Sequence, residues 1–173
     1  CISRMERTGV VSTETAQALG VVGMAARSSG VDIDTRFDFN DKWYTSLDVV
    51  KPFKATGDVH SRFKLRYKEI KQSMQIVKKL LDKLKEFRNE QILTNPNKTL
   101  APNAFAISMT EGWRGEIVHI ALTGASGELL RYKMKDPSFN NWYMLAMAVR
   151  NNGVSDFPLC NKSFNLSYCG NDL

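Results

Sequence analysis

The sequence is poor in the residues from which metal sites and covalent catalysis are built. Its 173 residues include three cysteines and two histidines, and no CxxC pair occurs. An odd and sparse set of cysteines does not describe a disulfide framework. His60 and His119 each lack an HxH or HxxxH partner, so a zinc site built on them is not expected. Phosphate-binding glycine loops and the GxSxG nucleophile elbow are absent as well.

Long apolar runs are also missing. No stretch of about 18 apolar residues occurs, so a membrane-spanning helix is not expected. The first residues, CISRMERTGVV, contain neither the apolar centre of a signal peptide nor an initiating methionine. We therefore expect a fragment of a longer cytoplasmic protein, with residues 1–173 forming a single domain.

Basic charge is concentrated in the middle of the chain. Residues 58–90 contain ten lysines and arginines against five acids, and so supply +5 of the net charge of +6. Such a segment is compatible with binding to nucleic acid or to anionic lipid. Because no nucleic-acid-binding motif accompanies it, a solvated helix face is the simpler interpretation, and nucleic acid is not expected as a partner. A basic interaction module that binds nucleic acid or lipid stays open as an alternative function.

Helical periodicity is clearest in the same part of the chain. Between Asp58 and Arg88, seven apolar residues recur at alternating spacings of four and three, which predicts one long helix. The stripe that they form is predicted to lie in the core, with the lysines on the other side. It comprises Phe63, Tyr67, Ile70, Met74, Val77, Leu81 and Leu84. A shorter helix is predicted within residues 12–20, STETAQALG, from a capping hydroxyl at its start and a glycine at its end.

After the long helix the period changes to two. Residues 105–109, 116–122 and 128–134 predict three strands of a small antiparallel sheet, the last two joined by the hairpin loop TGASG. The segment DPSFNN, residues 136–141, ends the sheet and caps a helix predicted at residues 142–153. The expected fold class is α+β, with helices, including the long one, packed around the sheet.

Two short segments stand out by their composition. The segment EGWRGE places Glu111, Arg114 and Glu116 around two glycines between strands. The glycines allow a tight turn, so the segment is either an ion-paired structural turn or a polar site that faces a partner. The segment VVGMAARSSG, residues 21–30, is rich in small residues that let its backbone approach another part of the molecule closely.

Four ordered motifs resemble a known family. They are ERTGVVSTETAQALGVVGMAARSSGVDID, GDVHSRFKLRYKEIKQSMQIVKKLL, EGWRGE and KDPSFNNW. Together they are similar to the C-terminal half of the large subunit of membrane-bound, energy-converting nickel–iron hydrogenases of the formate hydrogenlyase type. The homologous 49-kDa subunit of complex I has the same pattern. The resemblance implies a hydrogenase large-subunit-like fragment and a role in a membrane-associated redox complex, with hydrogenase-like or NADH:quinone oxidoreductase electron transfer.

The resemblance also implies partners, cofactors and a location. The implied partners are an iron–sulfur subunit and membrane-arm subunits, and the implied location is cytoplasmic, peripheral to the inner membrane. Hydrogenase members hold a nickel–iron centre with two CxxC pairs, whereas complex I members lack the metal and receive the quinone head group in the equivalent cavity. NAD and quinone are therefore implied for the complex and no cofactor for this fragment, which is expected to be inactive alone.

The end of the chain departs from the hydrogenase pattern. That pattern reads S-L-D-P-C-x-x-C, and when it is laid on SFNLSYCGND its two cysteine positions fall on Ser167 and Gly170. Cys169 is one residue away from the second position and points in a different direction, so it does not replace the missing thiolate. A serine hydroxyl is also a poor ligand for a soft metal. The implied nickel site is therefore expected to be degenerate.

Three residues match positions that line the active cavity in the family. Arg27 matches an arginine of a loop in that cavity, and Arg114 and Glu116 match an RGE turn near it. These residues form the expected site, and no metal ligand is expected among them. An active nickel–iron hydrogenase large subunit stays open as the alternative enzyme.

Overall fold

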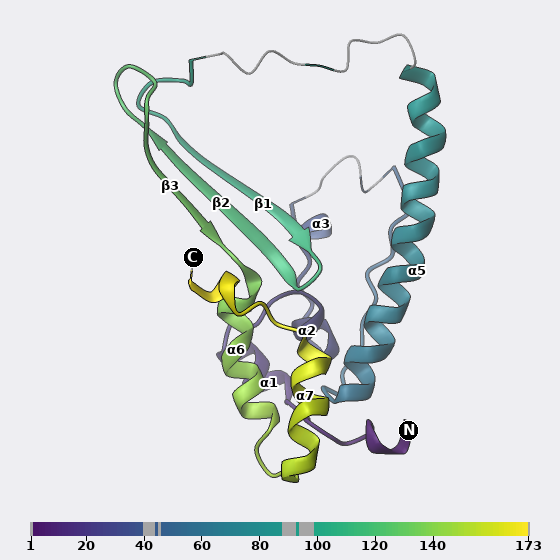
Figure 1. Cartoon of the computed structure of the whole chain (residues 1–173). Coiled ribbons are helices and arrows are strands. Elements are labelled where there is room, and N and C mark those ends of the chain that lie inside the picture. Colours follow the sequence, from purple (N-terminus) through teal and green to yellow (C-terminus); the bar gives the residue numbers. More distant parts are fainter. Residues whose placement is uncertain (1, 40–43, 45, 88–92, 94–98, 173) are drawn as a thin grey trace.

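The computed structural model describes residues 2–39, 44, 46–87, 93 and 99–172, so Cys1 and the last residues of the basic segment, 88–90, lie outside the described part. Figure 1 shows a body of helices from which two arms diverge, one the sheet and the other the long helix α5. Helices and a three-stranded antiparallel sheet make up this chain, which confirms the predicted α+β class.

The body is built from short helices that share one core. They are α1 (Thr13–Ala18), α2 (Gly23–Ser28), α6 (Pro137–Ala148) and α7 (Phe157–Phe164). Their buried side chains include Ala16, Ala25, Ala26, Met144, Leu145, Ala148, Cys160 and Phe164. The residues that α1 and α2 contribute to this core are alanines, Ala16, Ala25 and Ala26, whose small side chains allow close packing.

The helix predicted at residues 142–153 begins and ends earlier in the structure. It starts at Pro137 because Asp136 caps it, accepting a hydrogen bond from the N–H of Ser138 at 2.7 Å. Proline also suits the first helical position, where no N–H is needed. The sequence pattern does not predict α2 or α7. These helices have six and eight residues, which is too short for an apolar periodicity of about 3.6 residues to be recognised.

The sheet is an antiparallel meander in the order β1-β2-β3, which confirms the prediction of three strands. The strands are β1 (Phe105–Gly112), β2 (Gly115–Thr123) and β3 (Leu129–Lys135). Gly112 pairs with Gly115, so the β1–β2 turn consists of Trp113 and Arg114. This turn lies at the body, whereas the loop between β2 and β3 lies at the far end of the sheet (Figure 1).

Short elements complete the described chain. They are α3 (Thr35–Asp38), η1 (Ile2–Arg4), η2 (Lys85–Phe87), η3 (Val154–Asp156) and η4 (Cys169–Asp172). Among the residues that the structure describes, no helix combines the length and the hydropathy of a membrane span.

The predicted long helix is α5 (Val59–Leu84), which Asp58 caps by accepting a hydrogen bond from the N–H of Ser61 at 2.7 Å. The prediction that its apolar stripe lies in the core is wrong. Every residue of the stripe is exposed, from 44% for Ile70 to 69% for Met74. The first turns of α5 pack on the body through another face, and the later turns extend away from it (Figure 1).

The face of α5 that the fold buries carries Val59 and Leu65 together with the polar side chains of Ser61 and Arg62. Arg62 is fully buried and donates to the carbonyl groups of Gly9 at 2.9 Å and Gly57 at 2.7 Å, and to the hydroxyl of Ser163 at 2.9 Å. One turn later, Arg66 donates to the carbonyl of Ser163 at 2.8 Å. Because buried guanidinium groups need these acceptors, the hydrogen bonds fix the rotation of α5 about its axis. The apolar stripe is thereby turned away from the body.

Candidate functional site

The β1–β2 turn is held against the N-terminus of α2 by contact between two glycines. Gly23 has a φ of +66° and Gly115 a φ of +138°, a region of backbone conformation that favours glycine. A Cβ added to Gly23 would overlap the backbone of Gly115, so no side chain fits there. The close backbone approach predicted for residues 21–30 is confirmed, and the partner of this segment is the EGWRGE turn.

Asn141 of α6 fixes the same junction with hydrogen bonds. Its Oδ1 accepts from the N–H of Val22 at 3.0 Å, and its Nδ2 donates to the carbonyl of Val22 at 3.3 Å. The same Nδ2 lies 3.2 Å from the carbonyl of Arg114. Since Asn141 is buried, these bonds are shielded from water and hold the turn, α2 and α6 as one unit.

Arg114 connects the turn to the C-terminal segment. Its Nε donates a hydrogen bond to the carbonyl of Asn165, the residue that ends α7 with a φ of +52°. Asn165 precedes Ser167 by two residues. The structure therefore brings the RGE turn next to the segment that carries the two cysteine positions of the hydrogenase pattern.

Ser167 and Gly170 make structural contacts at these positions. The hydroxyl of Ser167 accepts a hydrogen bond from the N–H of Gly170 at 3.0 Å, and its N–H donates to the hydroxyl of Ser138 at 2.9 Å. A Cβ added to Gly170 would lie 2.6 Å from Cγ of Asp136, so this carboxyl group occupies the space of a side chain there. The sulfur of Cys169 is exposed and lies 3.5 Å from the Ser167 hydroxyl.

The donors at this segment do not fit a nickel–iron centre held by thiolates. A hydroxyl and a hydrogen atom stand where the pattern requires two cysteines, and neither is a soft ligand. Within the described ranges, no three His, Cys, Asp or Glu side chains are grouped so as to hold a metal ion.

A second polar cluster surrounds Arg27 on the other side of the turn. Arg27 is 2% exposed, and its guanidinium contacts three carboxylates: Glu69 at 2.5 Å, Glu111 at 2.8 Å and Asp34 at 3.2 Å. Asp34 is also paired with Arg36 at 2.6 Å. The cluster therefore joins α2, α3, α5 and β1 through a network of buried charges.

The two most buried carboxylates of this cluster have opposite pKa shifts. Burial raises the pKa of Glu111, and the positive charge of Arg27 offsets this only in part. Burial also acts to raise the pKa of Asp34, but the hydrogen bond from Arg36 and the charges of Arg27 and Arg36 outweigh it and lower the pKa. Of these two carboxylates, Glu111 therefore takes up a proton more readily than Asp34.

A groove of about 740 Å³ runs between α5 and the end of β1 that lies at the body. Arg27, Glu69 and Glu111 lie at its polar end. Its apolar wall consists of Ile70, Met74, Val77, Leu81 and Trp113. The guanidinium of Arg66 lies 5.0 Å above the ring of Trp113 and supports this part of the wall.

The expected site residues are divided between the two sides of the β1–β2 turn. Arg27 lines the groove, whereas Arg114 reaches the C-terminal segment and Glu116 pairs with Lys135 at 2.9 Å. The sequence interpretation missed Glu69, which is central to the Arg27 network. Glu69 lies outside the apolar stripe of α5, on the side of the helix that was predicted to face solvent. An acidic residue among the lysines and arginines of that side was the feature of the sequence that could have indicated it.

The chain is similar to components of membrane respiratory complexes. The family model described as respiratory-chain NADH dehydrogenase, 49-kDa subunit, matches residues 1–105. An NADH-quinone oxidoreductase component from Syntrophobacter fumaroxidans is 28% identical over 157 residues, which are 90% of this chain and 41% of that protein. The alpha component of the membrane-bound hydrogenase of Pyrococcus furiosus is 32% identical over 169 residues, or 89% of this chain and 39% of that protein.

The fold is also similar to that of a solved chain. That chain belongs to the membrane-bound sulfane sulfur reductase, an archaeal respiratory membrane complex. The two share a TM-score of 0.83 at 23% identity, over 99% of this chain and 47% of the other. The chain thus spans less than half the length of these relatives.

Proposed function

Because the chain belongs to the family of the 49-kDa subunit of respiratory-chain NADH dehydrogenase, we propose that it supplies half of the active cavity of a membrane-associated redox complex. The observation that carries this proposal is the assembly of the RGE turn, α2 and the C-terminal segment at one place. Arg114 reaches Asn165 across a turn locked by Gly23, Gly115 and Asn141. A rigid arginine held by buried neighbours is suited to position a polar reactant.

In this proposal the complex acts on quinone or another acceptor and has no nickel–iron centre in this subunit. Ser167 and Gly170 support it, because they provide no thiolate and already hold structural contacts. NAD and quinone are bound by the complex, and this chain alone binds no cofactor. The separate 173-residue chain is therefore proposed to be inactive.

The proposed partners are an iron–sulfur subunit and membrane-arm subunits, with the chain on the cytoplasmic side, peripheral to the inner membrane. The names of the relatives support a multi-subunit membrane complex, since they include components of NADH-quinone oxidoreductase and of membrane-bound hydrogenase. The solved chain of similar fold comes from an archaeal respiratory membrane complex, which agrees with a place in a membrane complex.

The proposal is tested on the purified complex that contains this chain. We expect Arg114→Ala to lower turnover with quinone by about tenfold or more, because a positioned charge in the cavity is lost, while the subunits stay assembled. Arg131→Ala, a change of the same kind on exposed β3, is the control and should leave turnover unchanged. Disassembly of the Arg114→Ala complex would show a structural role for this arginine.

Metal analysis of the same complex separates the main alternatives. We expect no nickel in stoichiometric amount and no hydrogen uptake. Stoichiometric nickel together with hydrogen uptake would favour the nickel–iron hydrogenase subunit instead. Tight, steeply salt-dependent binding of the chain to DNA would favour the basic interaction module.

A further inference from the structure

The apolar stripe of α5 is an exposed surface on a helix whose rotation is already fixed. Its seven residues, Phe63 to Leu84 at alternating spacings of four and three, are between 44% and 69% exposed. The fold orients α5 through Arg62 and Arg66, which bond to main-chain groups of the body. The stripe is therefore a preformed apolar surface and does not contribute to the core.

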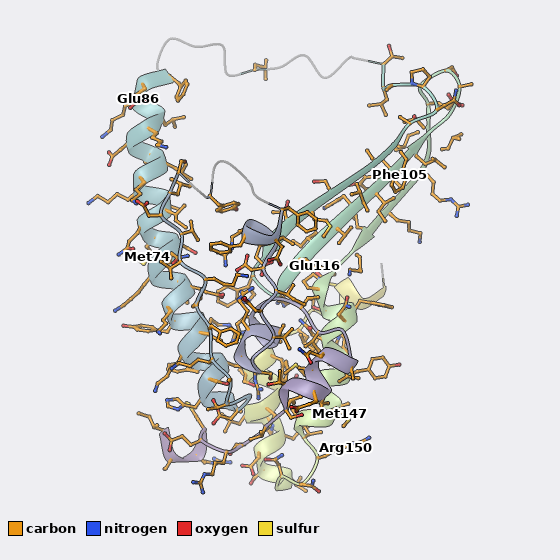
Figure 2. The ribbon with its side chains drawn as sticks, turned by 180° about the vertical axis from the view of Figure 1, so that it is seen from behind. Met74, Glu86, Phe105, Glu116, Met147 and Arg150 are labelled. Atoms are coloured by element: carbon orange, nitrogen blue, oxygen red, sulfur yellow. The ribbon has the colours of Figure 1, made fainter. Side chains whose placement is uncertain are left out.

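One face of the sheet presents a second apolar surface toward the same groove. Strand alternation places Phe105 and Ile107 on the same face as Glu111, which lines the groove beside α5. Across the β1–β2 ladder, Phe105 pairs with Leu122 and adds to this face. Phe105, Ile107 and Leu122 are 67%, 54% and 41% exposed. Figure 2 shows Met74 on α5 and Phe105 on the sheet, on the two arms that diverge from the body.

We propose that an amphipathic helix with acidic flanks docks between these arms and covers the α5 stripe, and that this helix belongs to the portion of the family's subunit lying outside these 173 residues. The inference rests on the proposed function. It holds whether that portion is joined to this chain or supplied as a separate chain. The solved chain that shares this fold over 99% of the present chain is covered to only 47%, so more than half of it is additional polypeptide.

The shape and charge of the surface select the occupant. The groove continues along the later turns of α5 as a further apolar hollow of about 290 Å³, lined by Val77, Leu80, Leu81, Leu84 and Phe87. A long apolar channel beside a helix fits another helix. One flank of the stripe carries Lys64, Lys71 and Lys78, so carboxylates beside the partner's apolar residues would be complementary.

The same charges argue against two other occupants. A second copy packed stripe to stripe would bring the two sets of lysines together, which like-charge repulsion opposes. An anionic bilayer would have to enter the groove, whose end holds Glu69 and Glu111, and a flat surface does not reach a stripe that faces the sheet across a groove.

Photo-crosslinking in the assembled complex tests the occupant. The probe is p-benzoylphenylalanine in place of Met74, with the same probe in place of Lys68, on another side of α5, as the control. We expect the Met74 probe to form adducts with a peptide from the portion of the subunit outside these 173 residues. Adducts with a second copy of this chain, with lipid or with a subunit of a different family would overturn the proposal.

A charge substitution gives an independent measure. We expect Met74→Asp to lower recovery of the chain in the complex by about tenfold or more, because it places a carboxylate in a desolvated interface. Gln75→Asp adds the same charge one residue further, outside the stripe, and should assemble normally. Normal assembly of Met74→Asp would overturn the inference and leave the proposed function standing, whereas absence of the unmodified chain from any redox complex would overturn the proposed function.

Discussion

Arg62 is a charged side chain that the fold buries against neutral acceptors. It donates to two main-chain carbonyl groups and one hydroxyl, and its guanidinium lies 4.2 Å above the ring of Phe164. Burial lowers its pKa to about 10. The charge is tolerated because its donors bond to carbonyl oxygens and its flat face stacks on an aromatic ring.

Removal of this side chain should destabilise the chain strongly. We expect Arg62→Ala to lower the free energy of unfolding by about 3 kcal/mol, because it removes the donor that the buried carbonyl of Gly9 accepts from and opens a cavity. Urea denaturation followed by circular dichroism measures the change. Arg131→Ala removes an exposed arginine and should change stability by less than about 0.5 kcal/mol. Equal effects of the two substitutions would contradict the burial of Arg62.

Glu111 should make stability depend on pH in a defined direction. Its pKa is raised in the folded state, so the folded chain binds a proton more tightly than the unfolded chain does. Its contribution to stability is therefore fully present below the ordinary value of 4.5 and is lost as the pH rises through the folded-state pKa. Asp34 acts in the opposite sense, because its pKa is lowered.

The Glu111→Gln variant isolates this effect. We expect the difference in unfolding free energy between the variant and the unmodified chain to change with pH above 4.5 in favour of the variant, since glutamine stays neutral. Denaturation curves at several pH values measure it, and Glu86→Gln, at an exposed position, serves as the control. A difference independent of pH would show that Glu111 keeps its ordinary pKa.

At the scale of elements, the contact between α2 and the β1–β2 turn depends on the absence of a side chain at Gly23. We expect Gly23→Ala to lower the free energy of unfolding by roughly 2–4 kcal/mol, because the methyl group would overlap Gly115 and the φ of +66° is unfavourable for alanine. Thermal denaturation measures the loss.

Gly153→Ala is the matched control for this prediction. Gly153 has a φ of −68°, which alanine adopts readily. The atom nearest to a Cβ added there is a carboxylate oxygen of Asp156, at 3.3 Å. Alanine should therefore be tolerated there with little change in stability. A similar loss at both glycines would indicate that the α2–turn contact is not the reason for the effect at Gly23.

The elements themselves could be predicted where the sequence repeats a period often enough. The long row of apolar residues in α5 and the alternation in β1 to β3 each extend over several repeats, and the glycines mark the turn between β1 and β2. The six residues of α2 offer no such repeat. The resemblance to a family indicated Arg27, whereas Arg114 was indicated both by the composition of EGWRGE and by that resemblance.

At the scale of the whole molecule, the rotation of α5 could not be predicted from its own sequence. An apolar stripe normally faces the core, and by that rule Arg62 and Glu69 belong on the solvent side. In the structure these two residues face the body instead. Arg62 bonds to Gly9 and Ser163, and Glu69 bonds to Arg27, so residues distant in sequence supply the hydrogen-bond partners. Only the tertiary arrangement contains that information.

The burial of the polar face of α5 separates two tasks along a single helix. The buried row, which includes Arg62, orients the helix by donating hydrogen bonds to main-chain carbonyl groups. The apolar stripe is exposed, so its residues can change together with the surface that docks on them. Substitutions in the exposed row leave the hydrogen bonds of the buried face intact, so we expect them to change what docks on α5 more than the stability of the chain. Under the proposed function, the docking surface of such a subunit can therefore change in evolution while its fold stays the same.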